Sequence, residues 1–123
     1  MDDNKNMTIE KAKKLASHTM DLTNNIDRYP KKLRHSLVDR MQNISFDIYE
    51  LLDEANGMDL RWEKKERINT LFKAVRKCNR LMFFIELSHE KNLINMKSME
   101  HWSKMVKDVK FMTLGWIKSD KLR

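Results

Sequence analysis

The chain has 123 residues, a net charge of +7 and 41 % hydrophobic residues, enough for one domain with a core. Two glycines and one proline are too few for the many tight turns of an all-β fold, so the composition favours long helices with short connections. A single cysteine excludes an intrachain disulfide, and no N-terminal apolar run or stretch of about 20 apolar residues is present, so we expect a soluble, cytoplasmic protein.

The first helix is predicted from near Thr8 to Asp27. It ends there because Pro30 disfavours the helical conformation of the residue before it, Tyr29. One side of this helix is formed by Ala12, Leu15, Ala16, Thr19, Leu22, Thr23 and Ile26.

Three further helices are predicted from apolar residues spaced alternately three and four apart, which keeps them on one side of each helix. In the second helix they are Leu37, Met41, Ile44, Ile48, Leu51 and Ala55. In the third they are Ile68, Leu71, Val75, Cys78, Met82 and Ile85. In the fourth they are Met99, Trp102, Val106, Val109, Thr113 and Trp116. Asn56 and Gly57 form a stop signal after the second helix, and Asn95 is placed to cap the fourth.

Short connections between amphipathic helices make helices that follow one another antiparallel neighbours. The sequence therefore predicts an all-α fold, an antiparallel up-down-up-down four-helix bundle. It forms a single domain over residues 1–123, with short flexible ends at about 1–7 and 119–123.

Charge is distributed unevenly along the chain. Residues 28–40 carry five cations against one acid, residues 41–60 carry five acids and no lysine or arginine, and residues 61–80 carry eight cations against two acids. A field this uneven favours polyanions at particular surfaces, although a cluster of like charges can also be an ordinary solvated face.

The third helix carries four cations within about 100° of arc, opposite its apolar side. A row of cations suits phosphate contact, because each neutralised phosphate releases counterions. The candidate residues for binding nucleic acid or a polymerase are Arg28, Lys31, Lys32, Arg34, Arg40, Lys64, Lys65, Arg67, Lys73, Arg76, Lys77, Arg80, Lys104 and Lys107.

Three phenylalanines, Phe46, Phe84 and Phe111, are placed away from the predicted core. Phe111 lies among lysines of the fourth helix, which suits base stacking beside cations. Exposed aromatic residues also mark subunit or protein interfaces. Phe46 has acidic neighbours, so we favour an oligomer interface for the three, while a misplaced helical phase would put them in the core instead.

No constellation of catalytic or cofactor-binding residues stands out. Glu86 and His89 have the spacing of carboxylate-bridged metal sites, but such sites need a second pair, and Glu100 and His101 are adjacent and face different ways. Cys78 falls on an apolar side, as a packed core residue would. There is no glycine-rich phosphate loop or Ser-His-Asp arrangement. We therefore expect no enzyme activity, no metal site, no cofactor and no small-molecule substrate.

Five segments of the chain together form a recognisable pattern: residues 28–40 (RYPKKLRHSLVDR), 49–56 (YELLDEAN), 93–95, 100–102 and 114–119 (LGWIKS). They resemble the accessory variability determinant (Avd) proteins of diversity-generating retroelements. The first segment is similar to the first hairpin of that family, the second to its second helix, and the last three to its last hairpin and helix. The four-helix proteins encoded in ribosomal-RNA intervening sequences share this bundle. The resemblance covers roughly residues 15–119.

The resemblance implies a bacterial or phage-encoded homopentamer that associates with a reverse transcriptase and with RNA template or DNA during mutagenic retrohoming. It assigns Tyr29, Leu37 and Trp116 to packing positions. It places Lys31, Arg34 and Arg40 in the basic hairpin of the family. The alternative is a stand-alone bundle of the intervening-sequence type with no polymerase partner.

The chain departs from the Avd pattern at Met82, Glu86 and Phe111, where family members often carry arginine. Cations of the third helix, Lys73, Arg76 and Arg80, would serve in their place. Five assembled chains would carry a charge of about +35, five times +7, which would attract polyanions strongly at low salt.

Overall fold

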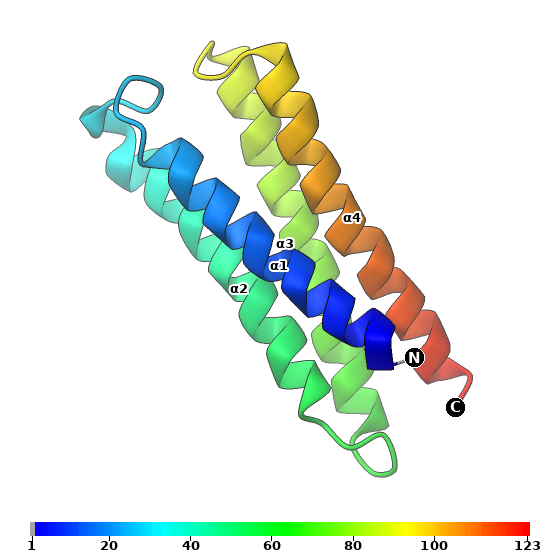
Figure 1. Cartoon of the computed structure of the whole chain (residues 1–123). Helices are drawn as coiled ribbons and strands as arrows, with labels where there is room; N and C mark the ends of the chain where they lie inside the picture. Colours follow the sequence, from blue (N-terminus) through cyan, green and yellow to red (C-terminus); the bar gives the residue numbers. More distant parts are fainter. Residues whose placement is uncertain (1) are drawn as a thin grey trace.

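Four long helices make up most of the protein, as the computed structural model shows (Figure 1). They are α1 (Asp2–Thr23), α2 (Asp39–Asn56), α3 (Lys64–Glu90) and α4 (Met96–Lys121). The structure describes residues 2–123, with side chains from Lys5 onward, and this range is all-helical and contains no strand. Within it, no helix is both long and apolar enough to cross a membrane.

The ends of α1 differ from the prediction. The helix begins at Asp2 rather than near Thr8, so residues 2–7 belong to it, while Met1 lies outside the described residues. It ends at Thr23, where the hydroxyl bonds back to the Thr19 carbonyl at 2.7 Å, and not at Asp27. Ile26, predicted on the apolar side, therefore lies beyond the helix and is 54 % exposed.

The stop signal and the cap at the other connections are confirmed. The amide of Gly57 donates to the carbonyls of Asp53 and Glu54 at 3.2 and 3.1 Å, which ends α2 at Asn56. The Asn95 side chain accepts a hydrogen bond from the Ser98 amide at 2.8 Å and so caps α4. At the C-terminus α4 continues to Lys121, so most of the predicted end at 119–123 is helical.

The start of the second helix is more complex than predicted. After Pro30 the chain forms a short 3₁₀ turn (Lys31–Leu33) and one π-helical turn (Arg34–Val38), and α2 begins only at Asp39. These turns still bury Leu37, as predicted. Tyr29, Leu37 and Trp116, the positions to which the resemblance assigns packing, are all buried.

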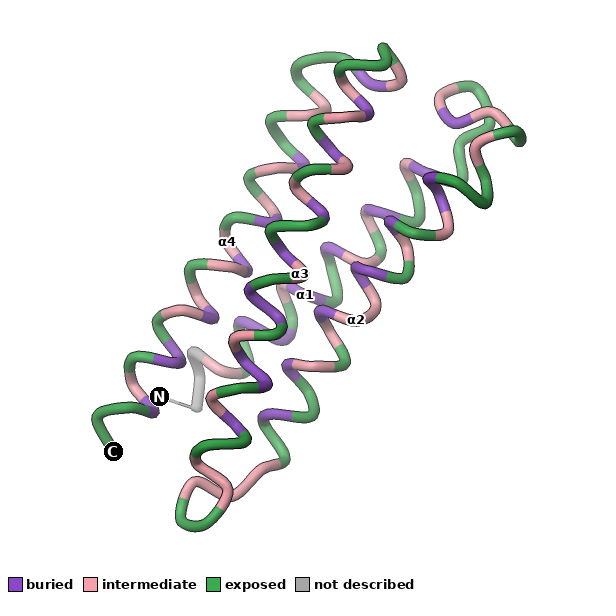
Figure 2. The backbone as a smooth tube through the Cα atoms, turned by 180° about the vertical axis from the view of Figure 1, so that it is seen from behind, coloured by how far each residue is buried: buried purple, intermediate pink, exposed green. Residues whose placement is uncertain are grey.

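The four helices pack as a ring, α1 against α2, α2 against α3, α3 against α4 and α4 against α1. Figure 2 shows the buried residues along the inward sides of the helices. Fully buried Trp102 donates from its indole to the Thr19 hydroxyl at 3.1 Å, which joins α4 to α1. The connections between α1 and α2 and between α3 and α4 lie at one end of the molecule. The α2–α3 connection and both termini lie at the other (Figure 1).

The predicted apolar sides are largely confirmed. Most of their members are buried, and those that are only half-buried are Ala16, Leu22, Leu51, Ile68, Met82 and Met99. Buried core residues that the spacing rule did not select are Ile9, Tyr29, Val38, Leu52, Ala74, Leu81, Ile94 and Ile117. Several of these lie beside a predicted position, because a helix inside a four-helix ring buries a wider sector than a single row of residues.

A buried ion pair joins α3 to α4. Arg67 is 4 % exposed and Asp120 is 1 % exposed. The Arg67 guanidinium donates to the Asp120 carboxylate at 2.8 and 3.3 Å and to the Met58 carbonyl at 3.0 Å, and it lies 5.5 Å from the centre of the Trp116 ring. The prediction of Arg67 as a nucleic-acid contact is therefore wrong, because its charge is inside the bundle and already paired.

We predict that Asp120→Ala destabilises the protein strongly, because it leaves the Arg67 charge buried without a partner. The free energy of unfolding, measured by urea denaturation, should fall by about 3–5 kcal/mol. The matched control is Lys104→Ala, which breaks the exposed Lys104–Asp108 pair (3.1 Å) and should cost less than about 1 kcal/mol. Equal losses in the two variants would contradict this account of the buried pair.

Candidate nucleic-acid interface

The predicted row of cations on α3 lies on the surface, but it borders a row of acids. Together the two rows line a groove between α2 and α3, which we call the charged groove. It is lined by Asp47, Glu50, Leu51 and Glu54 from α2 and by Lys73, Arg76, Lys77 and Arg80 from α3. Lys73, Arg76 and Arg80 are exposed, whereas half-buried Lys77 pairs with Asp47 at 3.1 Å. Three carboxylates therefore face four cations, and they offset most of the charge that the row would present to a phosphate.

A second group of cations lies where α3 packs against α4. We call it the lysine face, and its members are Lys65, Arg76, Lys107, Lys110, Lys118 and Lys121. On α4, Lys107 and Lys118 are eleven residues apart, as are Lys110 and Lys121. Eleven residues are close to three full turns, so the two members of each pair project from the same side of the helix. The four members on α4 therefore share one side of that helix, which faces α3 and solvent.

Contacts between α3 and α4 place these lysines beside α3. The Lys121 ammonium lies 5.2 Å from the centre of the Phe72 ring. Lys64 donates to the Lys121 carbonyl at 3.3 Å, which fixes the end of α4 against the start of α3. Farther along the pair of helices, Lys110 is close enough to Cys78 to affect its thiol. Lys65 and Arg76 are exposed on the same stretch of α3.

Most acids near the lysine face point elsewhere, but Glu86 and Glu100 line a pocket together with Lys107. Asp120 is buried against Arg67, and Asp108 pairs with Lys104 one turn back along α4. Glu66 lies seven residues before Lys73, on the side of α3 that borders the charged groove. None of the six cations forms an ion pair with a carboxylate in the described structure, although Arg76 also lines the charged groove. The positive charge of Lys65, Lys110, Lys118 and Lys121 is therefore largely uncompensated.

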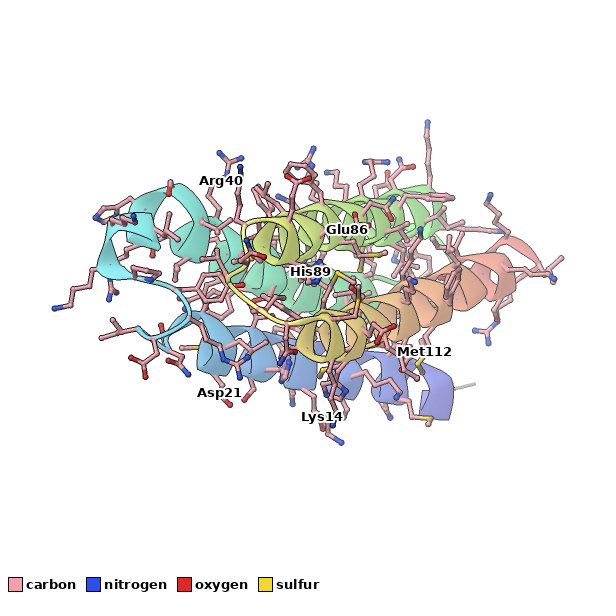
Figure 3. The ribbon with its side chains drawn as sticks, turned by 90° about the horizontal axis from the view of Figure 1, so that it is seen from above. Lys14, Asp21, Arg40, Glu86, His89 and Met112 are labelled. Atoms are coloured by element: carbon pink, nitrogen blue, oxygen red, sulfur yellow. The ribbon has the colours of Figure 1, made fainter. Side chains whose placement is uncertain are left out.

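Exposed cations also surround the connection between α1 and α2. Lys31, Lys32 and Arg34 are exposed on the two short turns there, as the sequence predicted. Arg40, labelled in Figure 3, is exposed at the start of α2, and its guanidinium lies 5.5 Å from the centre of the Phe84 ring. This basic hairpin is at the opposite end of the bundle from Lys121 (Figure 1).

Three further residues that were predicted to contact nucleic acid have partners within the chain. Half-buried Arg28 donates to the Ser98 hydroxyl at 3.2 Å and so ties the first connection to α4. Half-buried Lys64 donates to the end of α4, and Lys104 pairs with Asp108. These side chains are less available to a phosphate than Lys65 and Lys107, which are exposed.

The three predicted phenylalanines have different environments. Phe111 is 61 % exposed, with the Lys110 ammonium 5.7 Å from its ring centre. Phe84 packs partly buried against the core, so placing it away from the core was wrong, because α2 covers that side of α3. Phe46 is half-buried. The sequence did not single out Phe83, which is 56 % exposed, or Trp62, which is 70 % exposed.

Potential reactive groups are few in the described part of the chain. No group of three or more histidine, cysteine or acidic side chains is placed to hold a metal ion there. Glu86 and His89, labelled in Figure 3, lie on the last turns of α3 with no such third ligand among the described residues. Burial raises the pKa of the Cys78 thiol to about 12, against the opposing charge of Lys110, so this cysteine is not poised as a nucleophile.

His18 lies between α1 and α4 with an unsatisfied ring nitrogen. Its ring meets those of His101 and Trp102 edge-on, at centroid distances of 5.2 and 6.2 Å. Its Nε2 atom is buried and has no hydrogen-bond partner. Burial lowers the pKa of His18, the nearby His101 lowers it further, and Asp21 partly offsets both effects. Protonation of His18 is therefore less favourable in the folded protein than in the unfolded chain.

Comparison of the chain with protein-family models, curated proteins and solved structures finds no match. The likeness to Avd proteins therefore stays a hypothesis.

We predict that His18 makes the protein less stable in acid. Because its folded-state pKa lies below the unfolded value of about 6.5, its contribution is complete above that value and is lost as the pH falls through the folded-state pKa. His18→Gln should therefore reduce the loss of unfolding free energy between about pH 7.5 and pH 5, measured by urea denaturation. His35→Gln, which removes an exposed histidine paired with Asp39 at 3.2 Å, is the control. Identical pH profiles for wild type and His18→Gln would refute the prediction.

Proposed function

We propose that this protein is a non-enzymatic, nucleic-acid-binding four-helix bundle, with its helices in an antiparallel up-down-up-down order, and that the lysine face is its binding surface. The observation that carries the proposal is the set of six cations on α3 and α4, none of which forms an ion pair with a carboxylate in the described structure. Polyanions bind such a face chiefly because neutralised phosphates release condensed counterions.

The charged groove is a less favourable binding surface than the lysine face. Its cations face Asp47, Glu50 and Glu54, so a phosphate that enters the groove meets negative as well as positive charge. The Lys77–Asp47 pair would also have to open before Lys77 could turn to a phosphate. On the lysine face no ion pair of the described structure has to open, and carboxylates line pockets only with Arg76 and Lys107 among its members. RNA and DNA share the phosphate backbone on which this argument depends, so we propose that both bind.

The partners that we propose follow from the resemblance to Avd proteins. They are a reverse transcriptase and its RNA template or DNA, bound by a homo-oligomer, with the pentamer as the first form to test. A stand-alone bundle of the intervening-sequence type is the alternative. A reverse transcriptase gene beside the gene for this chain, and co-purification of the two products, would support the first. A gene inside a ribosomal-RNA insertion would support the second.

We predict that the lysine face dominates the salt dependence of nucleic-acid binding. Lys107/Lys118/Lys121→Gln should weaken binding by about ten-fold or more at low salt and reduce the slope of log K against log salt by about two to three. The measurement is fluorescence anisotropy of labelled RNA and DNA over a range of salt concentrations.

The matched control removes the same charge from the charged groove. Lys73/Lys77/Arg80→Gln also lowers the net charge from +7 to +4, by three charges, but it should change the slope by less than about one. Equal slopes in the two triple variants would mean that net charge alone governs binding. An unchanged slope in the lysine-face variant would mean that the lysine face does not bind the phosphates of the nucleic acid.

A further inference from the structure

Two exposed aromatic rings lie along the lysine face, Phe111 between Lys110 and Lys118 on α4 and Trp62 two residues before Lys64, and each is next to a cation in the sequence. Phe111 is 61 % exposed, and the Lys110 ammonium lies 5.7 Å from its ring centre. Trp62 is 70 % exposed, and the Arg61 guanidinium lies 4.5 Å from its ring centre. Neither ring packs in the core. The same pairing of a cation with an exposed ring thus occurs twice, on different elements.

The chain connects both rings to the lysine face. Trp62 precedes Lys64 by two residues, so their Cα atoms are at most about 7 Å apart. Lys64 in turn donates to the Lys121 carbonyl, at the far end of α4 from Phe111. Phe111 and Lys121 are ten residues, or about 15 Å, apart along the helix axis. Half-buried Phe72 lies between them, beneath the Lys121 ammonium.

We propose that the ligand of the lysine face is single-stranded nucleic acid, with unpaired bases stacked on Trp62 and Phe111 and the intervening phosphates on the lysines. This inference rests on the proposed function of the face. Aromatic rings beside backbone-binding cations are the means by which proteins hold single strands without reading their sequence, because every base has a face that can stack.

A duplex fits this surface less well. Its bases are stacked on one another, so exposed rings on the outside of a helical bundle can reach only its backbone, where they form no favourable stacking contact. The rings would then add nothing to binding, and only the lysines would contribute. A preference for single strands over duplex of equal length is therefore the property that separates stacking from simple charge attraction.

A protein partner fits less well for a different reason. The buried centres of protein interfaces are depleted in charged residues, and lysine is among the residues most depleted. Here Lys118 and Lys121 lie between the two rings along α4 and Lys110 lies next to Phe111, and none of the three forms an ion pair with a carboxylate in the described structure. Burying this stretch against a protein would require desolvating several unpaired ammonium groups, whereas a phosphate backbone pairs with them.

Trp62 provides a direct readout of stacking. The chain has three tryptophans, of which Trp102 is fully buried and Trp116 is 6 % exposed. A base that stacks on Trp62 should therefore quench the part of the fluorescence that comes from the exposed ring. Trp62→Phe keeps a ring for stacking and removes this signal, whereas Trp62→Ala removes both.

The test compares a thymidine oligonucleotide of about twelve nucleotides with a DNA duplex of about the same length, at equal salt. The oligonucleotide should bind more tightly and quench tryptophan fluorescence, and the duplex should not quench it. Trp62→Ala and Phe111→Ala should each weaken binding of the oligonucleotide by about ten-fold and leave duplex binding unchanged. Trp62→Phe should bind within about two-fold of wild type without the quenching.

Phe83→Ala is the matched control, because Phe83 is 56 % exposed but its ring contacts Phe84 at 5.1 Å and carries no cation partner in the described structure. Its oligonucleotide affinity should equal that of wild type. Equal affinity for single strand and duplex, without quenching and without an effect of Trp62→Ala, would overturn this inference and leave the proposed function standing. Failure of both nucleic acids to bind at low salt would overturn the proposed function, and this inference with it.

Discussion

The ion pair between Arg67 and Asp120 sets the relation between α3 and α4 on which the surface of the protein depends. It joins the first turn of α3 to the last turn of α4 inside the bundle, where a shift of one turn would leave both charges unpaired. The register that it imposes brings Lys121 over Phe72 and Lys64 to the end of α4. The buried pair thereby helps to hold the lysines of α4 beside α3.

The net charge of the chain says little about where a polyanion would bind. The acids of α2 lie beside the cations of α3, so the row that is most prominent in the sequence is also the one most offset by carboxylates. On α4 the cations are spread over several turns and form no dense cluster in the sequence. They become a continuous surface only when α3 packs alongside and adds Lys65 and Arg76. The difference between the two surfaces arises from which helices are neighbours, a property of the fold.

The features predicted correctly from the sequence are those that depend on the spacing of residues close together in the chain. The apolar sides of the helices, the stop at Gly57 and the cap at Asn95 all follow from residues within a few positions of one another, and they were largely right. The burial of Arg67 could not be predicted in this way, because its partner is 53 residues away. The lysine face did leave a local signal, the eleven-residue repeat of lysines on α4, but its lack of acids depends on packing between helices. The start of α1 at Asp2 could not be predicted from apolar spacing either, because residues 2–6 contain no apolar residue.

The lysine face carries an electrostatic cost that several other cations of the chain avoid. A carboxylate pairs with Lys104 one turn away, with Lys77 across a groove and with Arg67 in the core. Six like charges without such partners repel one another over distances comparable with the Debye length of about 8–10 Å, so the free protein is less stable than it would be with acids interspersed. A bound phosphate backbone removes that repulsion. If nucleic acid binds there as proposed, binding would relieve this repulsion, and high salt, which screens the repulsion, would also weaken binding.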